Sequence, residues 1–327
     1  MNEYDDSEFE EKNDNLEFFT RQEVMDLLKL DQRTYHLYIN KGILKPYRSS
    51  PKSKKFLFKR AEIEQVFKPT ITTKIISVIN QKGGVGKTTL THNIGFGFSS
   101  RGYKTLLIDS DPQENLSRGL GMPKDMEPEK TLVAIFDKYK KNDAGLEEIV
   151  HQLGENLFLI PSSIILSGVE TESDINIYFR LKTYIQHIYM DYDFIIIDCP
   201  PSLGTLTTNA LIASEYVLIP ICPDFYSPLG TEQLMKKINE TKEYNPSLKI
   251  IGAVINQKDS RTTLGNDIST ELKSELKTLM FETEINYNTK IKEAPFKNQS
   301  VLEYEKSSQG ATDIRSLIDE ILERIKG

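Results

Sequence analysis

The chain has 327 residues, a net charge of −7 at pH 7 and only two cysteines. This length exceeds one average domain and predicts two domains with a large buried core. Because no apolar stretch could span a bilayer and the N-terminus is acidic, we expect no transmembrane helix, no signal peptide and a cytoplasmic location. Cys199 and Cys222 lack the spacing of a zinc site or a disulfide framework and are predicted to be reduced core residues.

Charge is distributed unevenly along the first sixty residues. Residues 1–17 hold eight acids and one lysine, which is the composition of a disordered tail. Residues 41–60 hold eight lysines and arginines and no acid, which favours a surface that contacts phosphates. The alternative is that these residues form an ordinary solvent-exposed face, as most lysine runs do.

Residues 18–68 are predicted to form a small DNA-binding domain, joined to the rest of the chain by a linker at residues 69–73. Thr20 can cap a helix that ends at Lys29, and a second helix is expected over residues 32–40. A hairpin over residues 44–58, with lysines at its tip, and a helix over 61–67 would follow. This order resembles the winged helix-turn-helix of MerR-type regulators.

In such a domain the second helix would read base edges in the major groove, and the hairpin would contact phosphates. The candidate recognition residues are Gln32, Arg33, Thr34 and His36. The candidate phosphate contacts are Arg48, Lys52, Lys54 and Lys55.

The apolar run over residues 75–79 leads into the glycine-rich segment Lys82-Gly83-Gly84-Val85-Gly86-Lys87-Thr88-Thr89. Glycines allow backbone N–H groups to turn inward around an anion. Lys87 can supply a charge for the β- and γ-phosphates of a nucleotide, and the Thr88 hydroxyl can bind Mg²⁺. The segment therefore predicts a nucleotide-binding loop between a strand and a helix.

From residue 74 onward, apolar runs alternate with amphipathic stretches, which predicts an α/β domain over 74–327 with a mostly parallel sheet wrapped by helices. The predicted strands are 75–79, 105–108, 157–160, 194–197, 216–219 and 250–255. The predicted helices include 89–101, 175–190, 206–214, 229–243, 264–280 and 311–326.

Two of the predicted strands end in carboxylates, at the sheet edge where open α/β folds bind ligands. Asp198 follows one apolar run, and we expect it to hold Mg²⁺ directly or through water. Asp109 and Asp111 follow another run. An apolar strand that ends in Asp is common by itself, but coincidence does not explain two such strands together with the glycine-rich loop in this order.

Together the three motifs resemble the ParA/MinD superfamily of P-loop NTPases, and particularly the ParA partition ATPases with an N-terminal helix-turn-helix. Gln81 stands where the usual loop has its first glycine, and Lys82 follows it. In the family this extra lysine of the deviant Walker A loop reaches the phosphates of a dimer partner. The resemblance implies that Asp111 orients the attacking water and that Asp109 lies near the metal. It also implies that Asn256 and Pro295 border the adenine.

The resemblance further implies a protein that uses ATP and Mg²⁺ to partition plasmid or chromosomal DNA on the nucleoid. ATP would join two ATPase domains into a homodimer, and the dimer would bind DNA nonspecifically. A ParB-type partner would then stimulate hydrolysis, and the N-terminal domain could repress its own operon. Where many ParA proteins use an arginine on DNA, this chain has Tyr287, and the charge could come from Arg261, Lys290, Lys292 and Lys297.

Three alternatives stay open. A MinD-like division regulator would bind membrane through its C-terminal helix, but Asp319, Glu320 and Glu323 make that helix a poor lipid anchor. A nitrogenase-type reductase would need cysteines that bridge an iron–sulfur cluster, and Cys199 is poorly placed for that. In a transcription regulator the ATPase domain would only sense nucleotide, but the three intact carboxylates favour turnover.

Overall fold

A computed structural model of the full chain describes residues 18–27, 35, 39, 44–47, 57–59, 73–136, 146–172, 174–188, 191–223, 228–259 and 261–326. The chain divides into two compact units, Met1–Ile71 and Thr72–Gly327. The division between them falls inside residues 69–73.

The smaller unit contains a strand pair and a helix. Strand β1 (Phe18–Thr20) pairs antiparallel with β2 (Leu57–Lys59), and α2 (Arg21–Leu27) follows β1 directly. Thr20 caps α2 as predicted. The Glu23 N–H donates to Thr20 Oγ1 at 3.3 Å, and the Thr20 N–H donates to the Glu23 carboxylate at 2.6 Å. This reciprocal capping box explains why the helix begins where it does.

A small apolar core lies beneath these elements and consists of Val24, Tyr35, Leu44 and Phe58. The backbone of Tyr47 pairs with that of Leu57, which joins the two arms of the predicted hairpin. All eight residues predicted to contact DNA from this unit lie outside the described residues. The recognition role therefore stays a prediction for Gln32, Arg33, Thr34, His36, Arg48, Lys52, Lys54 and Lys55.

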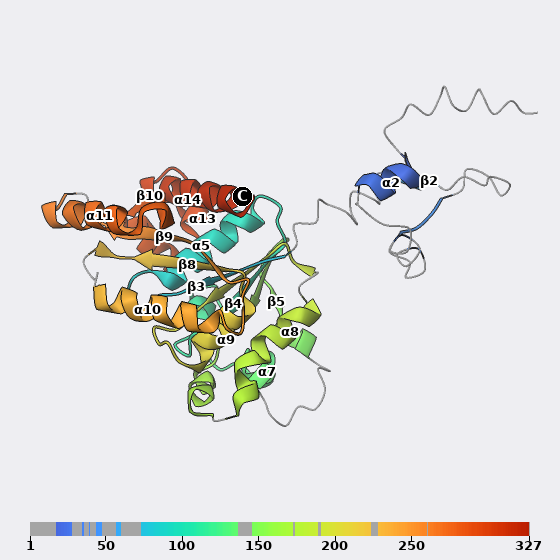
Figure 1. The fold of residues 1–327 in the computed structure, drawn as a ribbon, viewed down its shortest axis with the longest axis horizontal. Coiled ribbons are helices and arrows are strands. Elements are labelled where there is room, and N and C mark those ends of the chain that lie inside the picture. The colour runs from blue at the N-terminus through green and yellow to red at the C-terminus, as the bar shows by residue number, and fades with distance from the viewer. Residues whose placement is uncertain are drawn as a thin grey trace, which may run out of the picture. The chain divides into compact units, whose positions relative to one another are not determined.

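The larger unit is built on an eight-stranded sheet with the order β10-β9-β8-β3-β7-β4-β6-β5 (Figure 1). All neighbouring strands run parallel except β5, which is antiparallel to β6. Six strands confirm the predicted runs, namely β3 (Lys74–Val78), β4 (Thr105–Asp109), β6 (Leu157–Ile160), β7 (Phe194–Asp198), β8 (Tyr216–Ile221) and β9 (Lys249–Lys258). Two strands were not predicted, namely β5 (His151–Gln152) and β10 (Met280–Asn286).

Helices cover both faces of this sheet (Figure 1). One apolar layer lies under α5 (Lys87–Ser99), α6 (Asn115–Gly119), α12 (Thr289–Glu293), α13 (Val301–Tyr304) and α14 (Gln309–Lys326). The opposite layer lies under α7 (Val133–Phe136), α8 (Arg180–Ile188), α9 (Thr205–Ala213), α10 (Pro228–Thr241) and α11 (Thr263–Leu276). The short 3-10 helices are η1 (Pro128–Lys130), η2 (Leu146–Ile149), η3 (Ile164–Thr171), η4 (Ile175–Phe179), η7 (Lys277–Leu279) and η8 (Ala294–Lys297).

Two predicted helices have different bounds in the structure. The helix expected over 175–190 is the 3-10 helix η4 followed by the shorter α8, and the helix expected over 264–280 ends at Leu276. Residues 280–286 instead form the edge strand β10. Its Glu284 accepts hydrogen bonds from Lys258 of β9 at 2.7 Å and Ser269 of α11 at 2.7 Å. These contacts come from distant segments, so no local pattern predicts them.

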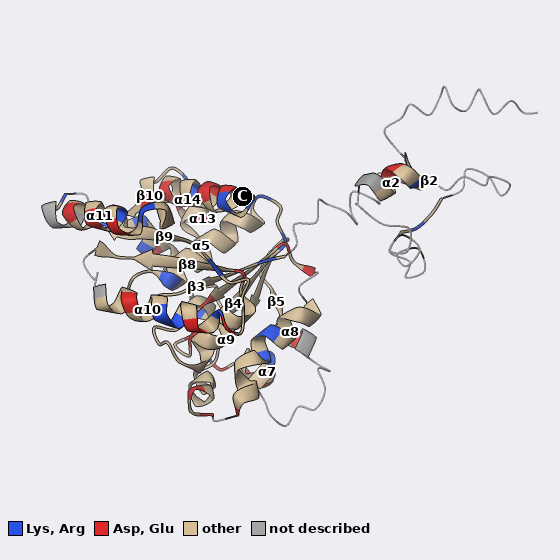
Figure 2. Ribbon diagram, viewed as in Figure 1, with Lys and Arg blue, Asp and Glu red and all other residues tan. Residues whose placement is uncertain are grey.

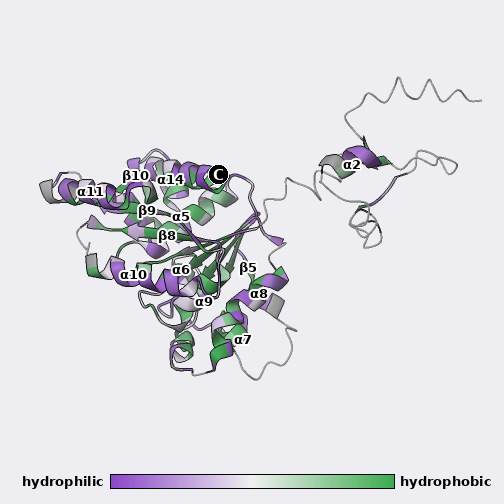
Figure 3. Cartoon of the chain, in the orientation of Figure 1, coloured by the Kyte–Doolittle hydropathy of each residue, from purple (hydrophilic) through white to green (hydrophobic). Residues whose placement is uncertain are grey.

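The C-terminal helix α14 packs its apolar face into the core. Ile314, Leu317, Ile318 and Ile321 are all fully buried there. Figure 3 shows hydrophobic strands at the centre of the unit, and Figure 2 shows charged residues along helices α10, α11 and α14. No helix within the described residues has the length and hydropathy of a bilayer-spanning segment.

Candidate nucleotide-binding and catalytic site

Three neighbouring strands bring the three predicted motifs to one edge of the sheet. Strand β7 lies between β3 and β4, and its Asp198 is level with Val78 on one side and Asp109 on the other. Because these strands are parallel, their carboxyl ends meet at the same edge. The glycine-rich loop after β3 therefore lies beside both acidic motifs.

The conformation of the loop depends on two of its glycines. Gly84 and Gly86 have φ angles of 76° and 92°, in the left-handed region that favours glycine. A Cβ on Gly86 would lie 2.1 Å from Asn256 Nδ2. That amide donates to the Val85 carbonyl at 2.8 Å, and the neighbouring Gln257 amide donates to the Gly84 carbonyl at 2.8 Å. The side chains of these two β9 residues thus hold the loop in shape.

These contacts place Asn256 against the phosphate loop, where its amide supports the loop backbone. Its predicted contact with adenine stays a prediction. Pro295 lies in η8 near Gly119 of α6, since a Cβ on Gly119 would be 3.7 Å from it. The contact of Pro295 with adenine also stays a prediction.

The two lysines of the loop have different surroundings. Lys87 is 7% exposed, and its ammonium donates to the Lys82 carbonyl at 3.2 Å. Burial lowers the pKa of Lys87, and the charges of Asp198, Cys199 and Asp111 oppose that shift. Lys82 is half-buried, and its ammonium forms no ion pair with the described residues. Neither lysine forms an ion pair with the described residues, but the charge of Lys87 interacts with the Asp198 and Asp111 carboxylates of its own chain.

The carboxylate of Asp198 is fully buried, and its Oδ2 has no hydrogen-bond partner among the described residues. Burial and the nearby charge of Asp109 raise its pKa well above the usual range, whereas Thr88 and Lys87 act in the opposite direction. An unpaired buried carboxylate oxygen is costly. A carboxylate and a threonine hydroxyl are oxygen ligands of the kind that Mg²⁺ prefers, so Asp198 and Thr88 fit a magnesium ion.

Asp109 is also fully buried, but both of its oxygens are occupied. Asp109 Oδ2 accepts from the Ser117 N–H at 2.8 Å and the Ser117 hydroxyl at 2.6 Å. Asp109 Oδ1 accepts from the Asp111 N–H at 3.2 Å. Burial outweighs these hydrogen bonds and raises the pKa of Asp109 to about 7. In the structure Asp109 therefore holds α6 and the Asp111 backbone in place, and metal binding by it stays a prediction.

Asp111 is 6% exposed and has one oxygen available. Its Oδ1 accepts from the Gln113 N–H at 2.9 Å, whereas Oδ2 takes no hydrogen bond from the described residues. The Ser162 hydroxyl donates to the Asp111 carbonyl at 2.6 Å and fixes the backbone beside it. A carboxylate with one free oxygen at the rim of the site can accept a hydrogen bond from water.

Several supporting residues were not predicted from the sequence. Asn80 accepts from the Lys82 N–H at 3.0 Å and donates to the Pro220 carbonyl at 2.8 Å. Ser117, Ser162 and Gln257 support the acidic motif or the loop through the hydrogen bonds given above. None of these residues belongs to a recognisable motif, and most of their contacts depend on a segment distant in the sequence.

The basic residues predicted on the ATPase surface mostly have partners. Arg261 forms a two-point ion pair with Asp259, with both distances at 2.8 Å, and Lys290 pairs with Glu293 at 2.8 Å. The Lys292 ammonium lies 4.2 Å from the centre of the Tyr287 ring, and Lys297 is exposed in η8.

Strand pairing brings part of this set together. The Tyr287 N–H donates to the Lys258 carbonyl at 2.9 Å, so the turn that carries Arg261 lies near Tyr287 and α12. The pKa of Arg261 is raised chiefly by its bonds to Asp259 and to a smaller extent by Tyr287. Two of the four predicted cations, Arg261 and Lys290, are therefore partly neutralised by ion pairs within the chain.

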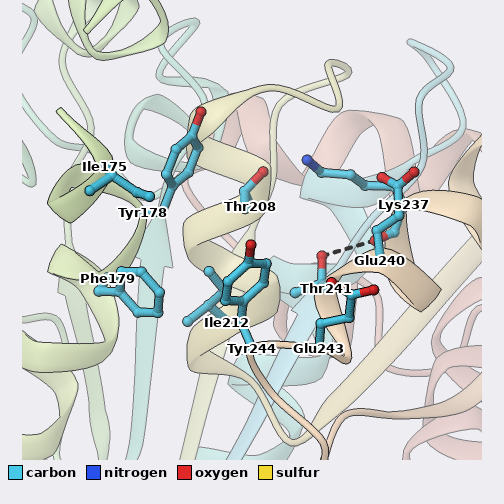
Figure 4. A pocket seen from close by; sticks show the side chains of 10 residues that line it. All are labelled: Ile175, Tyr178, Phe179, Thr208, Ile212, Lys237, Glu240, Thr241, Glu243 and Tyr244. Carbon is cyan, nitrogen blue, oxygen red and sulfur yellow. Dashed lines mark hydrogen bonds between the residues drawn. The ribbon is translucent and has the colours of Figure 1, made fainter. Parts of the chain in front are cut away.

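A separate cavity of about 330 Å³ lies between η4, α9 and α10 (Figure 4). Phe179 and Tyr244 meet there edge to face, with ring centroids 6.1 Å apart. Its other lining residues are Ile175, Tyr178, Thr208, Ile212, Lys237, Glu240, Thr241 and Glu243. None belongs to the phosphate loop or to the acidic motifs, so this cavity is distinct from the nucleotide site.

Comparison with known proteins identifies the larger unit. Residues 73–250 match a family model described as an AAA domain. The chain is 38% identical to the sporulation initiation inhibitor protein Soj of Bacillus subtilis over 253 residues, which are 76% of this chain and 98% of Soj. It is 35% identical to the chromosome partitioning protein ParA of Myxococcus xanthus over 255 residues, which are 77% of this chain and 88% of that protein.

A solved structure agrees with these matches. Cobyrinic acid a,c-diamide synthase from Mycobacterium smegmatis, solved with bound ATP analog and magnesium, superposes with a TM-score of 0.65 and 29% identity. The match covers 78% of this chain and 96% of that one. Together with the phosphate loop and the acidic strand ends, these similarities show that the chain belongs to the ParA family of P-loop ATPases.

Proposed function

We propose that this chain is an ATP-dependent DNA-partition ATPase that acts as a homodimer. The observation that carries the proposal is the convergence at one sheet edge of a preformed phosphate loop, the lysine Lys82 and the buried Asp198, whose Oδ2 has no partner among the described residues. The relatives named Soj and ParA support it, because this chain covers almost all of the first and most of the second.

Bound Mg-ATP would supply the phosphoryl group that is transferred to water. In this proposal the backbone of residues 83–89 cradles the phosphates, and Lys87 neutralises their charge. Thr88 and Asp198 would hold the magnesium ion. Asp111 would accept a hydrogen bond from the attacking water and orient it, and Asp109 would keep Asp111 in position by accepting a hydrogen bond from the Asp111 N–H.

Lys82 is the reason to propose a dimer. Its backbone is fixed by Asn80, but its ammonium has no anionic partner among the described residues. We assign this ammonium to the phosphates of a second subunit, so that each site is complete only when two chains face each other across ATP. Binding of ATP would then shift the protein toward the dimer.

DNA and a ParB-type protein are the proposed partners, with the protein on the nucleoid in the cytoplasm. The N-terminal unit would bind an operator, and the ATP-bound dimer would bind DNA nonspecifically through Arg261, Lys290, Lys292 and Lys297. Because two of these four are ion-paired, we expect Lys292 and Lys297 to carry more of that contact. The ParB-type partner would stimulate hydrolysis and release the DNA.

Three alternatives are less well supported by the site. A MinD-like membrane regulator would need an available apolar face on its C-terminal helix, but the apolar face of α14 is buried in the core. A regulator that only senses nucleotide would not need the free oxygen of Asp111. Cys199 and Cys222 are both buried, which also argues against a cluster that bridges two subunits.

Light scattering with ADP or ATP tests the catalytic part of the proposal. Wild-type protein should form a transient dimer with Mg-ATP. Asp111→Ala should accumulate the dimer, because it removes the group that orients water and leaves the phosphate cradle intact. Lys82→Ala should remain monomeric with either nucleotide. Wild-type turnover in Asp111→Ala would show that its assigned role is wrong.

Filter binding to operator and random DNA over a salt series tests how DNA binding is divided between the N-terminal unit and the ATPase unit. Deleting residues 1–68 should remove operator preference and leave ATP-dependent nonspecific binding. If Lys292 and Lys297 contact phosphates, each replacement by Ala should reduce the slope of log affinity against log salt by about one unit. Loss of all DNA binding in the truncated protein would instead make the ATPase unit a switch for the N-terminal unit alone.

A further inference from the structure

The first turn of α9 has an unusual source of stabilisation. This helix begins at Thr205, and its N-cap residue, Gly204, has no side chain with which to cap the free N–H groups. The carboxylate of Glu170 in η3 takes that place. Glu170 Oε2 accepts from the Thr205 N–H at 2.6 Å, and Oε1 accepts more weakly from the Leu206 N–H at 3.4 Å.

The position of α9 connects this contact to the catalytic site. Residues 199–204 link Asp198, the candidate magnesium ligand, to the first turn of α9. The Glu170 carboxylate also accepts from the Ser202 hydroxyl at 3.4 Å, and the Thr207 hydroxyl donates to the Ser202 carbonyl at 2.6 Å. The far end of the loop that begins at Asp198 is thus tied to η3.

The other end of η3 contacts the second acidic motif. The Ile164 N–H donates to Glu114 at 2.9 Å, and Glu114 is three residues beyond Asp111. Just before η3, the Ser162 hydroxyl donates to the Asp111 carbonyl at 2.6 Å. One short segment, residues 162–170, therefore contacts the Asp111 motif at one end and, at the other, the start of the helix that follows Asp198.

We propose that Glu170 is a positioning residue for the ATPase reaction, because its carboxylate holds the loop after Asp198 in register with the Asp111 motif. A carboxylate at a helix N-terminus is favoured by the helix dipole and by charge-assisted hydrogen bonds to free N–H groups. A small displacement of a group that holds the metal weakens magnesium binding and slows the reaction. The inference rests on the ATPase activity proposed above.

Gly204 supplies a matched test of this geometry. A Cβ on Gly204 would lie 2.0 Å from Glu170 Oε2, and the backbone of Gly204 is extended (φ −83°, ψ −153°) and not left-handed. Gly204→Ala should therefore displace the Glu170 carboxylate without the strain that a left-handed backbone would add. If both changes act through one contact, Glu170→Ala and Gly204→Ala should be strongly non-additive.

Two measurements on the full-length protein test the proposal. The first is hydrogen exchange of the Thr205 and Leu206 amides without nucleotide, and both single variants should lose protection there. The second is binding of mant-ATP, a fluorescent ATP analogue, as a function of Mg²⁺ concentration. The half-saturating Mg²⁺ concentration should rise about tenfold in Glu170→Ala, less in Glu170→Gln, and no further in the double variant. Exposed Glu155 provides the control variant Glu155→Ala.

The outcomes separate a positioning role from a merely structural one. Lost amide protection with an unchanged Mg²⁺ dependence would overturn the proposal and leave Glu170 as a helix cap only. Unchanged protection, or additive effects of Glu170→Ala and Gly204→Ala, would refute the contact itself. Absence of ATP hydrolysis by the wild type would count against the proposed function, whereas the binding titration would still decide the role of Glu170.

Discussion

Alanine substitutions at three glycines of the phosphate loop should have sharply different effects on stability. A Cβ on Gly83 would meet no atom within 4 Å, and its φ is outside the left-handed region. Gly84 has the same open space but a φ of 76°. Gly86 combines a φ of 92° with a Cβ position 2.1 Å from Asn256 Nδ2. The series therefore separates backbone strain from steric displacement.

The expected costs follow from these environments. Gly83→Ala should leave the free energy of unfolding within about 0.5 kcal/mol of the wild type. Gly84→Ala should lower it by about 1 kcal/mol, because alanine is strained in the left-handed region. Gly86→Ala should lower it by about 3 kcal/mol, because it adds to that strain the loss of the Asn256 bond to Val85 and leaves buried polar groups without partners.

Urea unfolding of the nucleotide-free protein, followed by circular dichroism at the transition of the larger unit, measures these differences. Repeating Gly86→Ala in an Asn256→Ala background isolates the displacement. There its cost should fall to about 1 kcal/mol, the value expected for strain alone. An equal cost for Gly84→Ala and Gly86→Ala, or the same cost in both backgrounds, would refute the reasoning.

Three further predictions concern charged groups. Lys87→Ala, and also Lys87→Arg, should abolish nucleotide binding, whereas Lys82→Ala should bind mant-ATP within about threefold of the wild type. Equal losses would remove the argument for action across a dimer. Arg324 donates to the Ile251 and Met280 carbonyls at 3.0 and 2.5 Å, so Arg324→Ala should lower the free energy of unfolding by about 2 kcal/mol in urea. Burial lowers the pKa of His92 to about 4. Because only the unfolded chain takes up this proton below its usual pKa of 6.5, His92 should by itself remove up to about 3 kcal/mol of stability between pH 6.5 and 4. Asp109, whose pKa is raised to about 7, contributes in the opposite direction over this range, so the His92 contribution is measured as the difference between the wild type and His92→Gln, and it should grow as the pH falls from 6.5 to 4.

The sequence by itself determined the features that depend on neighbouring residues. Alternating apolar runs predicted the six central strands, because buried parallel strands need continuous hydrophobic segments. The glycine-rich loop and the carboxylates at strand ends are also local patterns, and parallel pairing then brings them to one edge. Thr20 forms the expected helix cap for the same reason, since the capping box that it makes with Glu23 spans only four residues.

The tertiary structure alone decided the features that join distant segments. Strand β10 is stabilised by the hydrogen bonds of Glu284 to β9 and α11. The sequence did not predict this strand, because the helical pattern over residues 264–280 runs into its first residue. Asn256 and Gln257 support a phosphate loop about 170 residues earlier in the chain. Glu170 caps a helix that begins 35 residues later. Hydrogen bonds of this kind form only when the whole fold places the donor beside the acceptor. The sequence therefore shows which groups can donate or accept, but it does not show which of them pair.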